Sequence, residues 1–191
     1  MAQGDGRSMR ERMEAGELYL ADDPELGEMS TRALDLMDAY NATTARQSGV
    51  RRQLLTELLG AVGEGTEVRP PFYVDYGSNL TFGARCFANF GLVALDVARI
   101  TVGDDVQLGP KVQLLTPTHP VEPVARREKW ETARPITIGD NVWLGGGAIV
   151  CPGVTIGEDT VVGAGAVVTR DLPAGVVAVG IPARVTRKVT D

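Results

Sequence analysis

The sequence predicts a mainly β protein: a parallel β-helix of hexapeptide repeats with an N-terminal helical segment and one long protruding loop. Three observations in residues 136–184 support this prediction. Small or aliphatic residues recur every six positions, at Ile136, Val142, Ala148, Val154, Thr160 and Ala166. A second aliphatic series follows two places later, at Ile138, Leu144, Val150, Ile156, Val162 and Val168. Glycine comes next at Gly139, Gly145, Gly157 and Gly163.

A period of six fits neither an α-helix nor an ordinary hairpin. Residues two apart on a strand face the same way, so each unit gives a short strand and a turn. Gly, Asn and Asp suit such turns because they tolerate positive φ. Three units make one triangular coil, and stacked coils bury the aliphatic columns in a continuous core. Ordinary parallel crossovers are right-handed, and the repeats alone do not define the hand of this coil.

Residues 1–62 are expected to form a helical cap. A capping box at Ser8–Glu11 begins a first helix that Gly16 can end. Asp23-Pro24 predicts a turn, and a second helix follows, with apolar residues at helical spacing at Met29, Ala33, Leu36, Met37 and Tyr40. A third helix is expected from about Thr44 to Leu59. Such a cap covers the open end of a solenoid, and the alternative is that it also walls a substrate site.

Residues 63–191 are expected to form the β-helical domain. Its six-residue period is less regular between residues 70 and 89, and an irregularity at Asp96–Arg99 is two residues too long. The segment 115–135 breaks the period altogether and is polar and rich in proline. It must therefore leave the prism as a long loop, and loops of this length are usually functional or disordered.

Composition narrows the possible functions. The chain has 191 residues, 43% of them hydrophobic, which is enough for one packed domain. The net charge of −6 disfavours a nucleic-acid partner. Cys86 and Cys151 form no motif, so a disulfide is not expected. We see neither a signal peptide nor an apolar run long enough to span a bilayer, so we expect a cytoplasmic protein without a membrane partner.

His119, the only histidine, stands at the start of the protruding loop. An exposed loop histidine without a role is the alternative, but the rigid base of the loop and the flanking Pro117 and Pro120 favour a general base. One histidine and two separated cysteines cannot furnish a conventional zinc site, so no metal is expected. Nucleotide hydrolysis and a Ser/His/Asp nucleophile lack their motifs.

Several longer segments carry a resemblance that covers nearly the whole chain. They are AGELY (15–19), DPEL (23–26), PPFYVDYGSN (70–79), FANFG (87–91), TPTHPVEP (116–123), PITIGDNVWLGGGAIVCPGVTIGED (135–159), VVGAGAVVTRDLP (161–173) and VGIPARV (179–185). With these segments the chain resembles the maltose and galactoside O-acetyltransferase family. The resemblance implies a left-handed coil, a homotrimer with active sites between neighbouring coils, and direct attack of an acceptor hydroxyl on acetyl-CoA.

The resemblance also implies site residues. His119 is implied as the general base, and the acceptor contacts are implied at Asp75, Phe87, Asn89, Asp96, Glu131 and Trp143. The alternatives are turn carboxylates for Asp75 and Asp96, a solvated charge for Glu131, and packing between subunits for Trp143.

Coenzyme A contacts are implied at Trp143, Gly146, Ala164, Thr169, Arg170, Arg184 and Arg187. The arginines and Lys188 gather where the solenoid ends, and an acidic protein needs local cations to meet the cofactor's phosphates. A solvated basic tail is the alternative. Gly146 stands where the family often has a serine whose backbone N–H faces the thioester carbonyl. Ala164 and Thr169 match residues along the pantetheine arm, and otherwise simply fill their rows.

We therefore expect an acetyl-CoA-dependent O-acetyltransferase that acts on a hydroxyl of a maltose-, galactoside- or glucose-like sugar. Two alternatives stay open. One is an acyltransferase of the same fold with a different hydroxyl or amino acceptor, such as a serine, an antibiotic or an amino sugar. The other is a non-catalytic trimeric scaffold, which the joint presence of Asn89, His119 and Trp143 disfavours.

Overall fold

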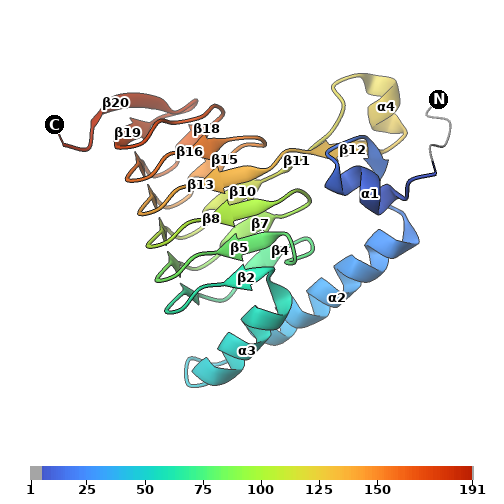
Figure 1. Cartoon of the computed structure of the whole chain (residues 1–191), viewed down its shortest axis with the longest axis horizontal. Helices are drawn as coiled ribbons and strands as arrows, with labels where there is room; N and C mark the ends of the chain where they lie inside the picture. The colour runs from blue at the N-terminus through green and yellow to red at the C-terminus, as the bar shows by residue number, and fades with distance from the viewer. Residues whose placement is uncertain (1–5, 191) are drawn as a thin grey trace.

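The protein is a three-sided prism of parallel strands with helices at one end and a protruding loop (Figure 1). This computed structural model describes residues 6–190, so the first five residues of the N-terminal segment and Asp191 lie outside the described residues. The predicted parallel β-helix is confirmed. No helix within residues 6–190 is long and apolar enough to cross a membrane.

Each face of the prism is one sheet, and the chain visits the three faces in turn. The first face holds β2 (Ala61–Val62), β5 (Leu80–Phe82), β8 (Ile100–Val102), β13 (Ile136–Ile138) and β16 (Thr155–Ile156). The second holds β3 (Glu67–Val68), β6 (Phe87–Ala88), β9 (Gln107–Leu108), β14 (Trp143–Leu144), β17 (Val161–Val162), β19 (Val176–Val179) and the antiparallel β20 (Arg184–Lys188). The third holds β4 (Tyr73–Val74), β7 (Val93–Leu95), β10 (Gln113–Leu115), β15 (Ile149–Val150) and β18 (Val167–Val168).

Three edges, each a stack of turns, join these faces. The ladder edge joins the first face to the second through turns at residues 63–66, 83–86, 103–106, 139–142 and 157–160. The glycine edge joins the second to the third at residues 69–72, 89–92, 109–112, 145–148 and 163–166. The loop edge joins the third back to the first at residues 75–79, 96–99, 116–135, 151–154 and 169–171.

The interior is filled by the aliphatic columns that the repeat predicts. Ile136, Val142, Leu144 and Ala148 are completely buried. The parallel register stacks aliphatic side chains of successive coils on one another. Leu144, for example, lies between Leu108 and Val162. Because each coil buries its apolar side chains only against the coils above and below, the core is continuous along the prism.

Glycine is required at the periodic positions because the coils pack closely there, not because the backbone has a positive φ. A Cβ on Gly145 would lie 2.5 Å from the Ala164 nitrogen, and one on Gly139 would lie 2.6 Å from the Glu158 nitrogen. The positive φ falls two places further on, for example 55° at Asn141. The expectation that glycine serves the turn conformation is therefore corrected for these positions.

The N-terminal segment forms three helices. The capping box is confirmed at the start of α1 (Met9–Glu14), where Ser8 accepts a hydrogen bond from the Glu11 amide. The turn expected at Asp23-Pro24 is instead the start of α2 (Pro24–Asn41), because the Asp23 carboxylate caps the Glu25 amide and Pro suits the first helical position. The third helix, α3 (Ser48–Leu58), begins later than expected.

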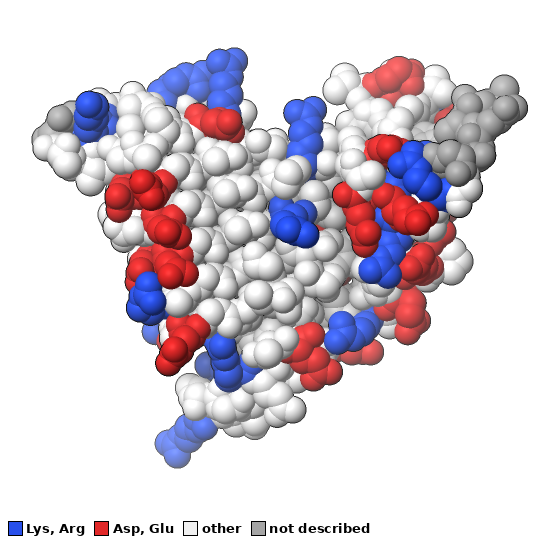
Figure 2. Space-filling view, viewed as in Figure 1, with Lys and Arg blue, Asp and Glu red and all other residues white. Residues whose placement is uncertain are grey.

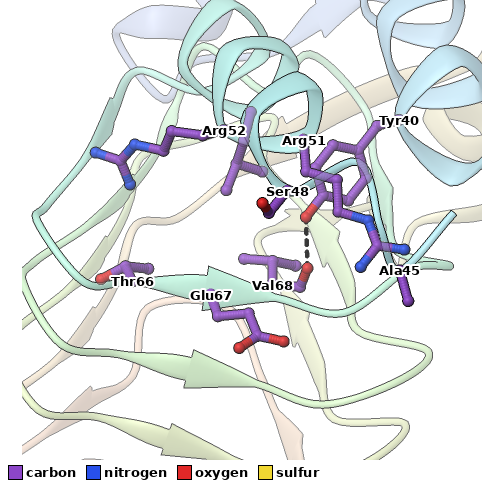
Figure 3. Close-up of a pocket in the computed structure, with 9 residues that line it drawn as sticks. Tyr40, Ala45, Ser48, Arg51, Arg52, Thr66, Glu67 and Val68 are labelled. Carbon is purple, nitrogen blue, oxygen red and sulfur yellow. Dashed lines mark hydrogen bonds between the residues drawn. The ribbon is translucent and has the colours of Figure 1, made fainter. Parts of the chain in front are cut away.

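Helices α2 and α3 cover the first coil. Figure 3 shows the Tyr40 hydroxyl donating to the Val68 carbonyl oxygen beneath α3. Arg52 donates to the Val62 carbonyl oxygen at 2.8 Å, and a cavity of about 320 Å³ remains between α3 and this coil. The first coil strand starts at Ala61, ahead of the expected boundary at residue 63.

The protruding loop has structure of its own. It contains β11 (Pro117–Thr118), α4 (Pro123–Arg127) and β12 (Trp130–Ala133). The short strand β1 (Tyr19–Leu20) pairs with β12, so that β1, β12 and β11 form a small antiparallel sheet. The N-terminal segment therefore holds the loop, although 112 residues separate Tyr19 from Glu131 in the chain.

Candidate active site

A pocket of about 440 Å³ opens on the loop edge, between the loop, β1, α2 and the turn after β4. It brings together three of the predicted site residues, Asp75, His119 and Glu131. The other residues that line it are Tyr19, Ala21, Leu26, Gly27, Ser30, Tyr76, Leu95, Val97 and Pro117. The pocket therefore combines one imidazole and two carboxylates with both polar and apolar side chains.

His119 follows β11, and its side chain is 56% exposed. Its Nδ1 lies 4.0 Å from Oε1 of Glu131. The other carboxylate oxygen of Glu131 accepts a hydrogen bond of 2.9 Å from the buried hydroxyl of Tyr19. Burial and this hydrogen bond raise the pKa of Tyr19, which stays a donor. Glu131 is thus fixed at one oxygen and presents the other toward the imidazole.

Asp75 directly follows β4 and faces the pocket. Within residues 6–190 its carboxylate forms no hydrogen bond and no ion pair. Burial, with added repulsion from Asp96 and Glu131, raises the pKa of Asp75 to about 6. A half-buried carboxylate without a partner in the protein is a group suited to contact a ligand.

Asp96 departs from its expected role. Its side chain is fully buried and accepts hydrogen bonds from the backbone amides of Asp75 (3.0 Å), Tyr76 (2.9 Å) and Asn79 (3.1 Å). Burial raises the pKa of Asp96, and these amides partly oppose the rise. The expectation of direct acceptor contact is therefore corrected: Asp96 holds the turn that presents Asp75.

Asn89, Gly146 and Ala164 lie on the glycine edge, away from the His119 pocket. Gly146 and Ala164 occupy neighbouring coils, and a Cβ on Gly146 would approach atoms of Pro110 to 3.3 Å. In the part of the chain that the structure describes, the Gly146 N–H donates to no protein acceptor. This N–H is therefore available to a ligand, as a backbone oxyanion donor must be.

Phe87 and Trp143 point outward from the second face. They share one column, since Gln107 pairs with Phe87 below it and with Trp143 above it. Trp143 is 55% exposed, whereas Phe87 is partly covered by the guanidinium of Arg69 at 4.8 Å from its ring centre. An exposed tryptophan on a flat face offers an apolar contact to a ligand or to another subunit.

The remaining predicted cofactor residues lie at the C-terminal coils. Thr169 and Arg170 are exposed on the loop edge just after β18. Arg184, Arg187 and Lys188 belong to β20, and Figure 2 shows basic side chains at this end of the prism. These cations therefore lie at the C-terminal end of the prism, Arg170 on the loop edge and the other three on the second face, where they can meet an anionic ligand.

The predicted residues therefore lie on the loop edge, the glycine edge and the second face, and the third face separates the two edges. Asp75, His119 and Glu131 belong to the loop edge, whereas Asn89, Gly146 and Ala164 belong to the glycine edge. The sequence analysis assigned no site role to Tyr19 or Ser30, which also line the pocket. Their contacts with the loop and coils are distant in sequence, so no local pattern reveals them.

Two family profiles match the chain. Residues 12–63 match the maltose acetyltransferase hexapeptide capping motif, and residues 135–170 match the bacterial transferase hexapeptide with six repeats. The chain is 49% identical over 179 residues to nodulation protein L of Rhizobium meliloti (strain 1021), covering 94% of this chain and 98% of that protein. It is 41% identical over 183 residues to the galactoside O-acetyltransferase of Escherichia coli (strain K12), covering 96% and 90%.

Two solved structures are similar throughout their length. A galactoside acetyltransferase in complex with coenzyme A gives a TM-score of 0.93 at 40% identity, over 96% of this chain and 92% of that one. A maltose O-acetyltransferase from Clostridium difficile 630 gives 0.95 at 40% identity, over 96% and 98%. The fold and these matches define a hexapeptide-repeat O-acetyltransferase, which confirms the predicted enzyme class. The chain belongs to the maltose and galactoside O-acetyltransferase family.

Proposed function

We propose that this enzyme transfers the acetyl group of acetyl-CoA to a sugar hydroxyl with His119 as the general base. The observation that carries the proposal is the pocket in which the only imidazole of the chain meets Asp75 and Glu131. Relatives named for galactoside and maltose acetylation support the sugar acceptor, and a neighbour in complex with coenzyme A supports the donor.

His119 takes the proton from the acceptor hydroxyl as that oxygen attacks the thioester carbonyl carbon. Nε2 serves as the base, because Nδ1 faces the Glu131 carboxylate, which favours the tautomer protonated at Nδ1. The tetrahedral oxyanion then collapses, the C–S bond breaks, and the protonated imidazole returns its proton to the departing thiolate. Glu131 stabilises the imidazolium between these two proton transfers.

The residues of the glycine edge and the C-terminal coils suit the donor. The free N–H of Gly146 can stabilise the oxyanion without the hydroxyl of a serine. Trp143, Ala164 and Thr169 can border the pantetheine arm, and Arg170, Arg184, Arg187 and Lys188 can meet the phosphates. No residue in this scheme needs a metal ion.

A homotrimer would bring the residues of the loop edge and those of the glycine edge together. The third face separates His119 from Asn89 and Gly146 within one chain, so we place the loop edge of one protomer against the glycine edge of the next. Asn89 and Trp143 would then border the pocket of the neighbouring protomer. A cytoplasmic location stays a prediction of the sequence.

The test is release of free thiol from acetyl-CoA in the presence of maltose, methyl β-galactoside or glucose. We expect acceptor-dependent turnover, and a loss on the order of a hundredfold or more in kcat for His119→Ala. Glu158→Gln, an exposed substitution on the ladder edge, is the matched control and should keep full activity.

Size-exclusion chromatography with light scattering should give a trimer for wild type and His119→Ala alike. Full turnover in His119→Ala would remove the general-base mechanism. Absence of turnover with every hydroxyl acceptor in the wild type would remove the sugar assignment and favour a scaffold.

A further inference from the structure

We propose that the preferred acceptor is an amino sugar, bound with its protonated amine against Asp75 and a hydroxyl at His119. This inference rests on the proposed function and names the substrate class of the same pocket. It follows from the negative charge of the pocket wall and from the lack of a protein partner for the Asp75 carboxylate. It also follows from the fact that a protonated amine is not a nucleophile, so that the hydroxyl is the group acetylated.

Within one protomer, the wall of the pocket carries acidic charge only. Asp75 and Glu131 are its two carboxylates, His119 is its one imidazole, and no lysine or arginine is among the described residues that line it. The buried carboxyl of Asp96 lies directly behind Asp75 and adds to the repulsion. A pocket with these groups attracts a cation and repels an anionic acceptor such as a sugar acid.

Asp75 lacks the protein partners that its neighbours have. Glu131 receives the Tyr19 hydroxyl, and Asp96 receives three backbone amides, whereas the Asp75 carboxylate meets no donor within residues 6–190. A neutral hydroxyl would supply a hydrogen bond but would leave the repulsion among the carboxylates. An ammonium group would supply both the hydrogen bond and the opposite charge.

Binding as the ammonium ion also determines which atom is acetylated. A protonated amine has no lone pair, so it cannot attack the thioester while Asp75 holds it. The hydroxyl next to His119 remains the nucleophile, and its proton passes to the imidazole and then to the departing thiolate. The product is an ester, and the amine stays free.

The experiment compares three acceptors that differ in one substituent: methyl β-D-glucosaminide, methyl β-D-glucoside and methyl N-acetyl-β-D-glucosaminide. In the wild type at pH 7 we expect kcat/KM for the amino glycoside to exceed that for each neutral glycoside by about tenfold or more. In Asp75→Asn the ratio should fall toward one. Asp35→Asn, an exposed acid-to-amide change on α2 outside the pocket lining, should keep the wild-type ratio.

A pH series on the wild type tests the inference without any variant. The groups that face Asp75 are Glu131 and His119 of the loop, Tyr19 of β1, Tyr76 beside it and Asp96 behind it. Because the pKa of Asp75 is about 6, the amino-to-neutral ratio should rise between pH 5 and 7 as its carboxyl ionises. A pH effect on the shared proton-transfer step changes the rate with every acceptor alike and cancels in this ratio.

Equal kcat/KM for the amino and neutral glycosides, the same ratio in Asp75→Asn, or a ratio that does not change with pH would each overturn the inference. His119-dependent turnover of the neutral glycoside without amine preference would leave the proposed function intact. Failure of all three acceptors would overturn the inference, and failure of maltose, methyl β-galactoside and glucose as well would overturn both.

Discussion

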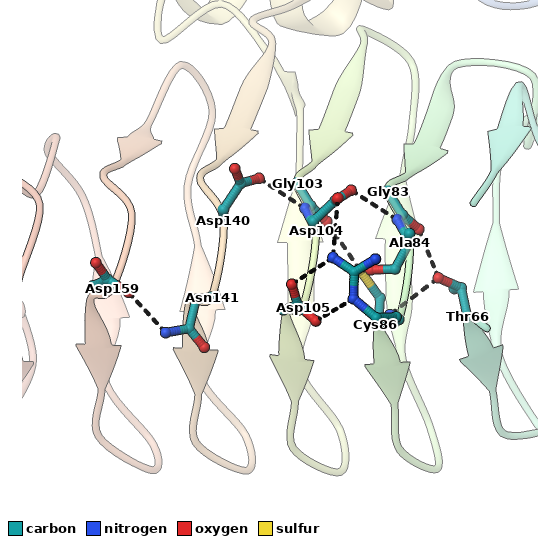
Figure 4. Close-up of polar contacts among 11 residues, drawn as sticks. Thr66, Gly83, Ala84, Cys86, Gly103, Asp104, Asp105, Asp140, Asn141 and Asp159 are labelled. Atoms are coloured by element: carbon teal, nitrogen blue, oxygen red, sulfur yellow. Dashed lines mark hydrogen bonds and ion pairs between the residues drawn. The ribbon is translucent and has the colours of Figure 1, made fainter. Parts of the chain in front are cut away.

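The ladder edge and the loop edge of the prism are both rich in aspartate, but among the described residues only the loop edge holds an aspartate, Asp75, whose carboxylate has no partner. On the ladder edge, Asp104 accepts from the Ala84 amide and Asp140 accepts from the Asp104 amide, each at 2.8 Å (Figure 4). Asp105 binds Arg85 at 2.7 Å. Each of these three carboxylates ties one coil to the next.

The loop edge instead holds carboxylates that crowd one another. Arg85 lowers the pKa of Asp105, whereas burial and neighbouring acids raise the pKa of Asp75 to about 6. The same residue type therefore contributes to folding at Asp105 and is held ready for a ligand at Asp75. An unpaired carboxylate lowers stability, and such a cost is typical of binding sites.

The largest effect is expected where the loop edge depends on a buried acid. Asp96→Ala leaves three backbone amides without acceptors and should lower the free energy of unfolding by about 3–5 kcal/mol. Asp140→Ala, on the ladder edge, removes one exposed hydrogen bond and should cost about 1 kcal/mol. Urea unfolding measures both, and equal costs would contradict the contrast between the two sites.

Glycine substitutions come next and separate close packing from backbone strain. Gly139→Ala on the ladder edge places a Cβ 2.6 Å from a backbone nitrogen and should cost about 2–3 kcal/mol. Gly153→Ala on the loop edge meets only the flexible side chain of Arg134, so its positive φ of 83° should cost about 1 kcal/mol. The order of the two thermal midpoints is the measurement, and the reverse order would refute this account of the repeat.

Asp75→Asn should stabilise the fold while it harms the activity. The pKa of Asp75 is raised in the folded state, so its favourable contribution is complete below about pH 4 and is lost as the pH rises through about 6. The variant should therefore gain roughly 1–2 kcal/mol at pH 7.5 and nothing at pH 4. Thermal midpoints at the two pH values provide the check, and destabilisation at pH 7.5 would show that the charge of Asp75 is paired.

The smallest effect is expected for the exposed ion pairs of the ladder edge. Arg85 is 59% exposed, and solvent screens its contacts with Asp104 and Asp105. Arg85→Ala should leave the urea midpoint within experimental error of the wild type at 0.15 M salt. A clear fall in the urea midpoint that disappears at high salt would show that the ladder edge depends on charge as well as on its backbone hydrogen bonds.

Much of the fold could be predicted from the sequence because its pattern is local. The six-residue period gave the columns that contain Ile136 and Val142, and the same period showed where the loop leaves the prism. The roles of Asp96 and Tyr19 could not be read in this way. Asp96 acts through backbone amides about twenty positions earlier, and Tyr19 meets Glu131 across 112 positions.

The site residues divide in the same way. His119 stood out because it is the single histidine of the chain and flanks a break in the period. The separation of Asn89 and Gly146 from His119 required the order of the three faces, which a linear pattern does not contain. The start of α2 at Pro24 was missed because a proline after aspartate can serve a turn and a helix start equally well.

The pairing of β1 with β12 has a consequence for the growing polypeptide. Tyr19 leaves the ribosome 112 residues before Glu131, which corresponds to roughly 6–22 s at ordinary elongation rates. During that interval the first coils can form on the helical cap, while β1 has no partner strand because β12 has not yet been synthesised. A nascent chain released before residue 131 would hold several finished coils and no complete catalytic centre.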